Sequence, residues 1–521
     1  MKPRLLPFLL IAAGHFSSIT RAADSAHPNV LFVVIDDLND WIGCMKGHPQ
    51  TKTPNIDRLA ERGILFTNAH CASPVCLASR TALFCGRYPD QTGVYSNWGK
   101  TRGRMPARDL QLPVYLAAAG YETLGTGKLY HAEGAPYFDG YFETEQRWSP
   151  FTQEQAKYTA EELPSKGTES PRHVIKAGPG NRDWVLPLNG LTSERNANSP
   201  EGESFDWGPV PVKDEEMGDV RITDWAIKQL AGLRPKPLFL GVGYARPHIP
   251  LFAPQQDFDR LPPVEQIQLP ETIADAPNDL GEQGKKTALD PITAGTHALV
   301  AQHHQWPQAV RAYLACVTFV DRQIGRLLDQ LDASPYADNT WIILWSDNGW
   351  HLGEKEHWGK WTGWRQATRV PLIIVPPRNQ TAVRGQQCNE PVSLVDLYPT
   401  LIDLCKVPKR EGLSGVSLTP LLANPGLKTD RAVVTTFDPG NYALSTRDWR
   451  FIRYSTGEEE LYDIQDDPHE WYNLAKDQAH DDQLAEMRQR LEKHLHDIGA
   501  GKSAGVPSSN GHGQKSQADD K

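Results

Sequence analysis

The chain has 521 residues, which is enough for one large α/β domain and a smaller second domain. Its formal net charge of −10 argues against general binding to nucleic acids. An anionic ligand is not excluded, because a local basic pocket can bind an anion on an acidic protein.

An export signal is predicted at the N-terminus. Lys2 and Arg4 precede an apolar run over residues 5–13, and Thr20 and Ala22 frame a small-x-small cleavage site. We therefore expect residues 1–22 to be a signal peptide and the mature protein to be secreted or periplasmic, or lysosomal in a eukaryote. The apolar run is too short to span a bilayer and no other long apolar run follows, so no membrane attachment is expected.

Buried strands and helices are predicted to alternate along most of the chain, as in a sheet flanked by helices. The predicted strands lie at 29–35, 120–125, 237–243, 340–346 and 370–375. The predicted helices lie at 55–62, 79–84, 113–119, 219–230 and 308–331. Residues 132–215 are rich in Gly, Pro and charged residues, and we expect long loops there over one end of the sheet.

The pattern changes near residue 428. Short strands at hairpin spacing and one final helix predict a small α+β domain over 429–499, after a large domain over 23–428. The predicted elements of this small domain are strands at 433–436, 442–445, 449–454 and 460–462 and a helix at 482–496. Residues 500–521 are predicted to be disordered.

The seven cysteines are an odd number, which leaves at least one unpaired in an exported protein. The sequence is consistent with disulfides but does not establish any pairing. The cysteines are Cys44, Cys71, Cys76, Cys85, Cys316, Cys388 and Cys405.

Acidic and amide side chains follow two of the predicted strands. Asp36 and Asp37 come after the first strand, and Asp347 and Asn348 after the strand at 340–346. In open α/β sheets ligands bind outside the carboxyl ends of the strands, and oxygen donors there suit a hard divalent cation, calcium more than zinc. Either pair alone would more simply be a strand cap that starts a turn.

Cys76 stands just before the predicted helix at 79–84 and four residues before Arg80. A helix N-terminus favours anions, so a thiol there could be a nucleophile. It could equally be a metal ligand or a buried apolar side chain.

Further cationic and imidazole groups follow predicted strands. Lys128 and His131 come shortly after the strand at 120–125, and His248 lies in a Pro-His-Ile-Pro loop after the strand at 237–243. Lys360 follows Asn348 by twelve positions within a tryptophan-rich segment. Lysine supplies a compact positive charge and histidine can move a proton near neutral pH, although an isolated lysine is usually a solvated surface residue.

These motifs together resemble the type I sulfatases. The segment from Cys76 to Arg80 is similar to the family signature C-x-[PA]-x-R, and Gly86 and Arg87 follow it as the Gly-Arg pair. The remaining motifs, G-K-x-x-H, Pro-His-Ile-Pro and the run from Asp347 to Lys360, look most like the iduronate-2-sulfatase-like branch. The resemblance covers nearly the whole mature chain and implies an alkaline-phosphatase-like fold, with a central, mostly parallel sheet flanked by helices.

The resemblance implies a sulfuric ester hydrolase that removes O-sulfate from a sulfated carbohydrate, exo-acting on 2-O-sulfated uronic acid or related polysaccharide fragments. A maturation enzyme would oxidise Cys76 to formylglycine (3-oxoalanine), and its hydrate would attack sulfur. The implied catalytic residues are Cys76, Arg80, Lys128, His131, His248 and Lys360. The implied calcium ligands are Asp36, Asp37, Cys76, Asp347 and Asn348, and the implied substrate contacts are Trp350 and Arg246.

Three positions depart from the family pattern. Ala78 replaces the commoner Pro, Cys85 stands where Thr or Ser is usual, and Asn348 stands where some members have His. Two other functions stay open. One is a phosphomonoesterase or phosphodiesterase of the same superfamily, with a Ser or Thr nucleophile and two zinc ions. The other is a non-catalytic sulfoglycan-binding protein.

Overall fold

The computed structural model describes residues 27–131, 134–143, 147–152, 155, 173–191, 194, 205–273, 278–292 and 295–500. The predicted signal peptide at 1–22, part of the predicted loop region at 132–215 and the predicted tail beyond residue 500 lie outside the described residues.

A nine-stranded sheet forms the centre of the molecule, with the order β14-β2-β13-β10-β1-β8-β3-β4 and with β15 paired to β2. Only β13 among these described strands runs antiparallel to its neighbours β10 and β2. The strands are β1 (Asn29–Ile35), β2 (Ile64–His70), β3 (Glu122–Gly127), β4 (Gly140–Phe142), β8 (Leu238–Tyr244), β10 (Thr340–Ser346), β13 (Arg369–Val375), β14 (Gln386–Cys388) and β15 (Val392–Ser393).

The side chains of β1 alternate between two hydrophobic cores, one on each face of the sheet. Leu31, Val33 and Ile35 belong to the first core, and Val30 and Phe32 to the second. Because successive strand side chains point to opposite faces, a continuous apolar run places apolar groups on both faces. The prediction of a strand buried on both sides is therefore confirmed.

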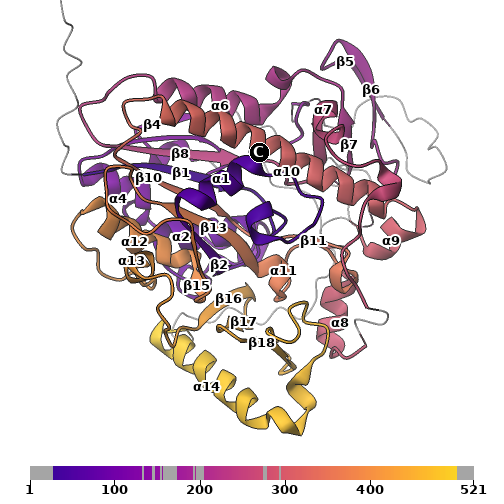
Figure 1. Ribbon diagram of the computed structural model, residues 1–521. Coiled ribbons are helices and arrows are strands. Elements are labelled where there is room, and N and C mark those ends of the chain that lie inside the picture. The colour runs from indigo at the N-terminus through magenta and orange to yellow at the C-terminus, as the bar shows by residue number, and fades with distance from the viewer. Residues whose placement is uncertain are drawn as a thin grey trace, which may run out of the picture.

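Helices cover both faces of the sheet (Figure 1). The first core is closed by α1 (Pro54–Arg62), α6 (Gly218–Gln229) and α10 (Trp306–Asp332). The second is closed by α2 (Cys76–Cys85), α4 (Leu112–Ala118), α12 (Leu397–Cys405) and α13 (Thr419–Ala423). Shorter helices are α3 (Pro89–Thr92), α7 (Gln255–Phe258), α8 (Glu282–Leu289), α9 (His297–Gln302) and α11 (Arg365–Thr368).

The C-terminal part is a four-stranded antiparallel sheet with one helix against it, at the bottom of Figure 1. Leu484, Met487 and Leu491 of the helix share a core with strand residues such as Leu444 and Phe451. The elements are β16 (Val433–Asp438), β17 (Asn441–Ser445), β18 (Trp449–Arg453), β19 (Glu459–Asp463) and α14 (Asp481–Asp497). The predicted α/β class with a smaller α+β part is confirmed.

The structure differs from the sequence predictions in several details. The strand β2 was not predicted, and β13 was predicted without its reversed direction. The helix predicted at 79–84 begins at Cys76 itself. The predicted loop region contains β4, and three small two-stranded sheets lie outside the central one. They pair β5 (His173–Gly178) with β6 (Arg182–Leu186), β7 (Trp207–Val210) with β9 (Leu251–Pro254), and β11 (His351–Leu352) with β12 (Trp358–Gly359).

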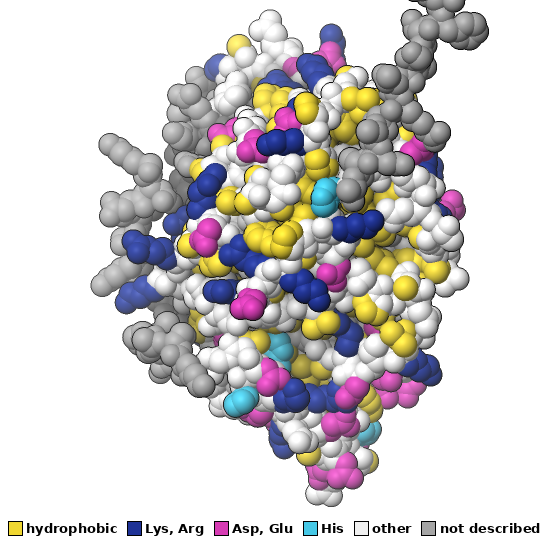
Figure 2. Space-filling view, turned by 90° about the vertical axis from the view of Figure 1, so that its left-hand side faces the viewer, with side chains coloured by type: hydrophobic (Ala, Val, Ile, Leu, Met, Phe, Trp, Pro, Cys, Tyr) yellow, Lys and Arg dark blue, Asp and Glu magenta, His cyan; other side chains and the backbone are white. Residues whose placement is uncertain are grey.

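All seven cysteines carry free thiols. Within the described ranges, no helix is long and apolar enough to cross a bilayer. Figure 2 shows the side of the molecule that lies at the left in Figure 1, and there basic and acidic side chains are interspersed. On that face, therefore, the acidic excess of the chain does not form one patch.

The N-terminus of α1 is satisfied by a carboxylate from α10. Asp321 accepts hydrogen bonds from the backbone N–H groups of Asn55 (3.1 Å) and Ile56 (2.8 Å) and from the Asn55 side chain (2.8 Å). Burial nevertheless raises the pKa of Asp321 to about 6, because desolvation outweighs these bonds.

This raised pKa predicts how stability depends on pH. Between pH 4 and 6 the folded state binds more protons at Asp321 than the unfolded state, so its contribution to stability falls as pH rises through that window. Relative to Asp321→Asn, the wild type should lose about 2 kcal/mol of unfolding free energy between pH 4 and pH 7. Urea denaturation of both proteins across this range measures the difference, and a pH-independent difference would contradict the assignment.

Candidate active site

The site begins where β1 and β10 end. These parallel strands are in register, with Ile35 opposite Ser346, so the residues that follow each strand meet. The backbone N–H of Asp37 donates to Asp347 Oδ1 (3.1 Å), and Asn348 Nδ2 donates to Asp37 Oδ1 (2.8 Å). The expected meeting of Asp36 and Asp37 with Asp347 and Asn348 is thus what the structure shows.

Helix α2 brings Cys76 to the same place. The Cys76 Sγ atom lies 3.6 Å from Asp36 Oδ1, 3.9 Å from Asp37 Oδ1 and 2.7 Å from Lys360 Nζ. The residue is fully buried, and burial, followed by the charge of Asp36, raises the pKa of its thiol against the opposing effect of Lys360 and Lys128. An unmodified Cys76 therefore stays in the weakly nucleophilic thiol form near neutral pH.

Three cations balance the three buried carboxylates. Lys128 contacts Asp36 and Lys360 contacts Asp37, while Arg80 pairs with both Asp36 (2.9 Å) and Asp347 (2.8 Å). All six side chains are almost completely buried. Burial alone would raise the pKa of Asp36, but Lys128, His248 and Arg80 hold it well below its usual value.

The pKa values of the other two carboxylates, Asp37 and Asp347, shift in the opposite direction. Burial raises the pKa of Asp37 although Lys360 opposes the shift, and burial raises the pKa of Asp347 to about 6 against the charge of Arg80. The guanidinium of Arg80 also donates to the backbone carbonyls of Lys128 and Leu129. Arg80 thus joins the ends of β1, β3 and β10 to α2, and its contacts are those of a residue that positions the carboxylates.

Two histidines border this cluster. His248 Nδ1 donates to the Ile249 carbonyl (2.6 Å), which leaves Nε2 facing Asp37 Oδ2 at 3.7 Å. His131 Nδ1 is buried with no hydrogen-bond partner among the described residues. Burial lowers the pKa of both imidazoles well below the usual value, and Lys128 lowers it further.

The cluster fits a hard cation. Ligand atoms of Asp36, Asp37, Cys76 and His248 all lie within 4.8 Å of one another. Asp37 Oδ2 and Asn348 Oδ1 are buried and accept no hydrogen bond from the described residues, so both are available as oxygen donors. Asp347 lies at the edge of this group, since its oxygens accept from Arg80 and from the backbone N–H groups of Asp37 and Asn348.

The two predicted substrate contacts lie below the surface. Arg246 is 1% exposed and donates to the backbone carbonyls of His248, Pro250 and Arg147, so it shapes the loop that presents His248. Trp350 is also 1% exposed, and Lys360 Nζ lies 5.7 Å from the centre of its ring. These contacts place Arg246 beside the His248 loop and Trp350 beside Lys360, and their roles as substrate contacts stay predictions.

The hairpin β11–β12 that precedes Lys360 is anchored by the C-terminal sheet region. Lys355 donates to the backbone carbonyl of Glu470, and Trp364 Nε1 donates to Glu460 Oε2 (2.8 Å). The Arg365 N–H donates to Glu470 Oε2 (2.6 Å). The small C-terminal part therefore fixes both sides of the segment that carries Lys360.

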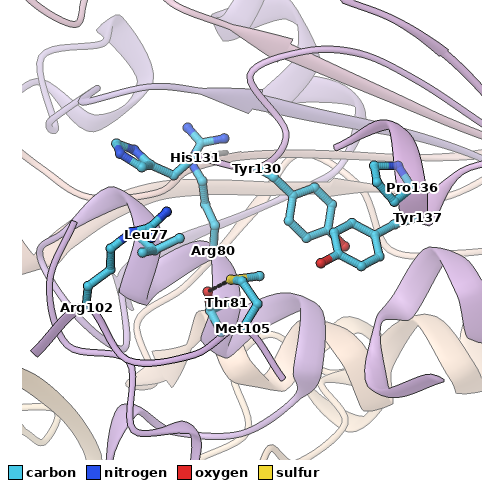
Figure 3. Close-up of a pocket in the computed structure, with 9 residues that line it drawn as sticks. All are labelled: Leu77, Arg80, Thr81, Arg102, Met105, Tyr130, His131, Pro136 and Tyr137. Atoms are coloured by element: carbon cyan, nitrogen blue, oxygen red, sulfur yellow. Dashed lines mark hydrogen bonds between the residues drawn. The ribbon is translucent and has the colours of Figure 1, made fainter. Parts of the chain in front are cut away.

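A cavity of about 330 Å³ adjoins the cluster. Figure 3 shows Leu77 and Arg102 on one side of it, Tyr130 and Tyr137 on the other, and His131 beside Arg80. The sequence did not predict Arg102, Met105 or Tyr137 as site residues, because they come from single 3-10 turns and a loop that carry no motif. The run of basic residues around Arg102 is the one feature of the sequence that could have indicated this side of the cavity.

A family model described as Sulfatase matches residues 28–407. The chain belongs to the sulfatase family. A second model, described as N-sulphoglucosamine sulphohydrolase, C-terminal, matches residues 353–497. The predicted family is confirmed, and this sulfatase is a sulfuric ester hydrolase.

Relatives extend over most of the sulfatase chain. A protein named Sulfatase from Formosa agariphila is 36% identical over 458 residues, which cover 86% of this chain and 83% of the relative. Human iduronate 2-sulfatase is 30% identical over 478 residues, which cover 82% of this chain and 76% of the relative. The solved phosphonate monoester hydrolase from Silicibacter pomeroyi has a TM-score of 0.70 at 19% identity, covers 91% of this chain and 96% of its own, and shows the fold alone.

Replacement of Arg80 tests the charge balance of the cluster. Arg80→Ala leaves two buried carboxylates without their shared partner, so the free energy of unfolding should fall by about 3–5 kcal/mol. Arg80→Lys keeps the charge but loses the planar guanidinium, so its free energy of unfolding should lie between those of the wild type and Arg80→Ala. The matched control is Arg58→Ala, whose ion pair with Asp329 is exposed and should change stability by less than about 1 kcal/mol. Equal urea midpoints for Arg80→Ala and Arg58→Ala would contradict the proposal that Arg80 balances the charge of the buried carboxylates.

Proposed function

We propose that this sulfatase removes O-sulfate from sulfated carbohydrates, exo-acting on 2-O-sulfated uronic acid, with a hydrated formylglycine made from Cys76 as nucleophile. The observation that carries the proposal is the position of Cys76 Sγ, buried between Lys360 and the Asp36–Asp37 pair in a member of the sulfatase family. The similarity to human iduronate 2-sulfatase supports the 2-O-sulfated uronate. The apolar leader supports an enzyme that acts outside the cytoplasm.

A maturation enzyme and its oxidant would remove two electrons from Cys76 and replace sulfur by oxygen, giving an aldehyde that adds water. Asp36, Asp37, Asn348 and the modified Cys76 would hold one Ca²⁺, because carboxylate and amide oxygens are the donors this ion prefers. Bound calcium supplies a Lewis acid that favours loss of a proton from the attacking hydroxyl.

In the first step one hydroxyl of the hydrate attacks sulfur, and the bond from sulfur to the sugar oxygen breaks. Lys128 and Lys360 supply buried positive charge for the sulfate oxygens. His248 keeps its proton on Nδ1, which donates to the Ile249 carbonyl, so Nε2 is free to accept the proton that the attacking hydroxyl loses and to pass it to the sugar oxygen.

In the second step the sulfate bound to the Cβ of residue 76 is expelled. His131 removes the proton of the remaining hydroxyl, the carbon–oxygen bond to sulfate breaks, and the aldehyde re-forms. Addition of water restores the hydrate. Arg80 acts in both steps through Asp36 and Asp347, which it holds in place.

Replacement of Cys76 tests the nucleophile. Cys76→Ala should reduce sulfate release from 2-O-sulfated uronate oligosaccharides by at least about 1000-fold, because no aldehyde can form. The circular dichroism spectrum should stay unchanged. The matched control is Cys44→Ala, a half-buried cysteine away from the cluster, which should keep wild-type turnover.

Mass spectrometry of the Cys76 peptide must show the aldehyde in the wild type. Undiminished turnover by Cys76→Ala would disprove the nucleophile. Hydrolysis of phosphate or phosphonate esters without sulfate release would favour the related phosphoesterase chemistry, and oligosaccharide binding by modified protein without any turnover would favour a binding protein.

The calcium assignment has a test independent of turnover. After treatment with a chelator, Ca²⁺ should raise the thermal midpoint of unfolding, because an ion that binds only the folded state stabilises it. Asp37→Asn and Asn348→Ala should weaken this shift, whereas Asp332→Asn, on a surface ion pair, should not. A shift that requires two Zn²⁺ per chain and is absent with Ca²⁺ would overturn the assignment.

A further inference from the structure

A loop beside the nucleophile is tied to it by a side chain. Asn97 Oδ1 accepts a hydrogen bond from the Leu77 N–H (3.0 Å), one residue after Cys76. The loop closes on itself, since the N–H groups of Tyr95 and Ser96 both donate to the Thr101 carbonyl (2.9 and 3.1 Å). The structure therefore presents residues 97–100 at a fixed place next to the active site.

An exposed tryptophan stands on this loop and rests on a second one. Trp98 is 46% exposed, and its ring centre lies 4.9 Å from that of Trp361 at 40°. Trp361 follows Lys360 directly, and its φ of 76° is a left-handed conformation that costs energy for a bulky side chain. Such local strain persists where the surrounding structure enforces it, and functional sites are where it gathers.

The aromatic pair is continuous with the cavity wall. Trp361 packs on the cluster that contains Leu77, together with Met105. Leu77 and Met105 both line the 330 Å³ cavity, as Figure 3 shows. Trp361 therefore adjoins the cavity wall that Leu77 and Met105 form, and Trp98 lies against Trp361.

The same loop carries positive charge that the described protein does not neutralise. Lys100, Arg102 and Arg104 are exposed, and none of them has an ion pair or hydrogen bond from its side chain to another described residue. Residues 93–108 contain no Asp or Glu, although the chain as a whole has a net charge of −10. This local excess of positive charge suits an anionic partner.

We propose that Trp98, Trp361, Lys100 and Arg102 form a second subsite, which binds the sugar units next to the sulfated residue in an anionic oligosaccharide. The proposal rests on the proposed function. The indole faces offer flat apolar surface for a sugar ring, and the two cations offer charge for its carboxylate or sulfate groups. Arg102 reaches both regions, because it also lines the cavity.

The test compares substrates of increasing length. Sulfate release would be measured on glycosaminoglycan oligosaccharides of two, four and six sugars that share a 2-O-sulfated uronate at the non-reducing end. We expect kcat/KM to rise with length in the wild type and to fall in Trp98→Ala, so that the ratio for four sugars over two drops about tenfold. Lys100→Ala with Arg102→Ala should lower the same ratio and weaken its dependence on salt.

Two controls isolate the subsite. Tyr472→Ala removes another exposed aromatic ring, 60% exposed in the C-terminal part, and should keep the wild-type length ratio. Binding of the four-sugar compound to Cys76→Ala, measured by calorimetry, should weaken about tenfold on adding Trp98→Ala.

The outcomes separate this inference from the proposed function. An unchanged length ratio and unchanged binding in Trp98→Ala, with normal sulfate release by the wild type, would overturn the subsite alone. If modified wild type releases no sulfate from any compound, the proposed function fails, and the calorimetry then decides the subsite by itself.

Discussion

Burial of three carboxylates against three cations is the constraint on which the site depends. Asp36, Asp37 and Asp347 could not stay ionised in the interior without Arg80, Lys128 and Lys360. Asp36 and Asp37 follow β1, and the other four groups come from α2 and from the segments after β3, β10 and β12, so the balance is reached only when these parts of the fold have come together. In the proposed function, the carboxylates of this charge-balanced group would also be donors for a cation, and its lysines would supply positive charge for the sulfate.

The C-terminal part of the chain belongs to this arrangement although it carries none of the six charges. Lys355, Trp364 and Arg365 attach the segment around Lys360 to Glu460 and Glu470. A carboxylate pair remote from the nucleophile thereby fixes one of the cations beside it.

Sequence reasoning identified the parts of the fold that depend on local pattern. Continuous apolar runs located β1, β8 and β10, and the motif residues after them met at one sheet edge as expected. The reversed direction of β13 could not be predicted, because strand direction depends on long-range pairing and not on composition. For Arg246 and Trp350 the predicted substrate contact stays a prediction, because residue type does not tell whether a buried side chain faces the ligand or supports a neighbouring residue. Trp98 and Arg102 lie in an irregular loop whose closure no periodicity encodes.

The complete burial of Cys76 sets an order of events in the life of the protein. The proposed maturation enzyme would have to accommodate the segment from Cys76 to Arg80 in its own active site, and in the folded chain these residues are buried in the first turns of α2. On the proposed mechanism, oxidation of Cys76 would therefore precede folding. A molecule that folds before oxidation would keep an inactive thiol at position 76. The fraction of active molecules in a preparation would then depend on the relative rates of oxidation and folding.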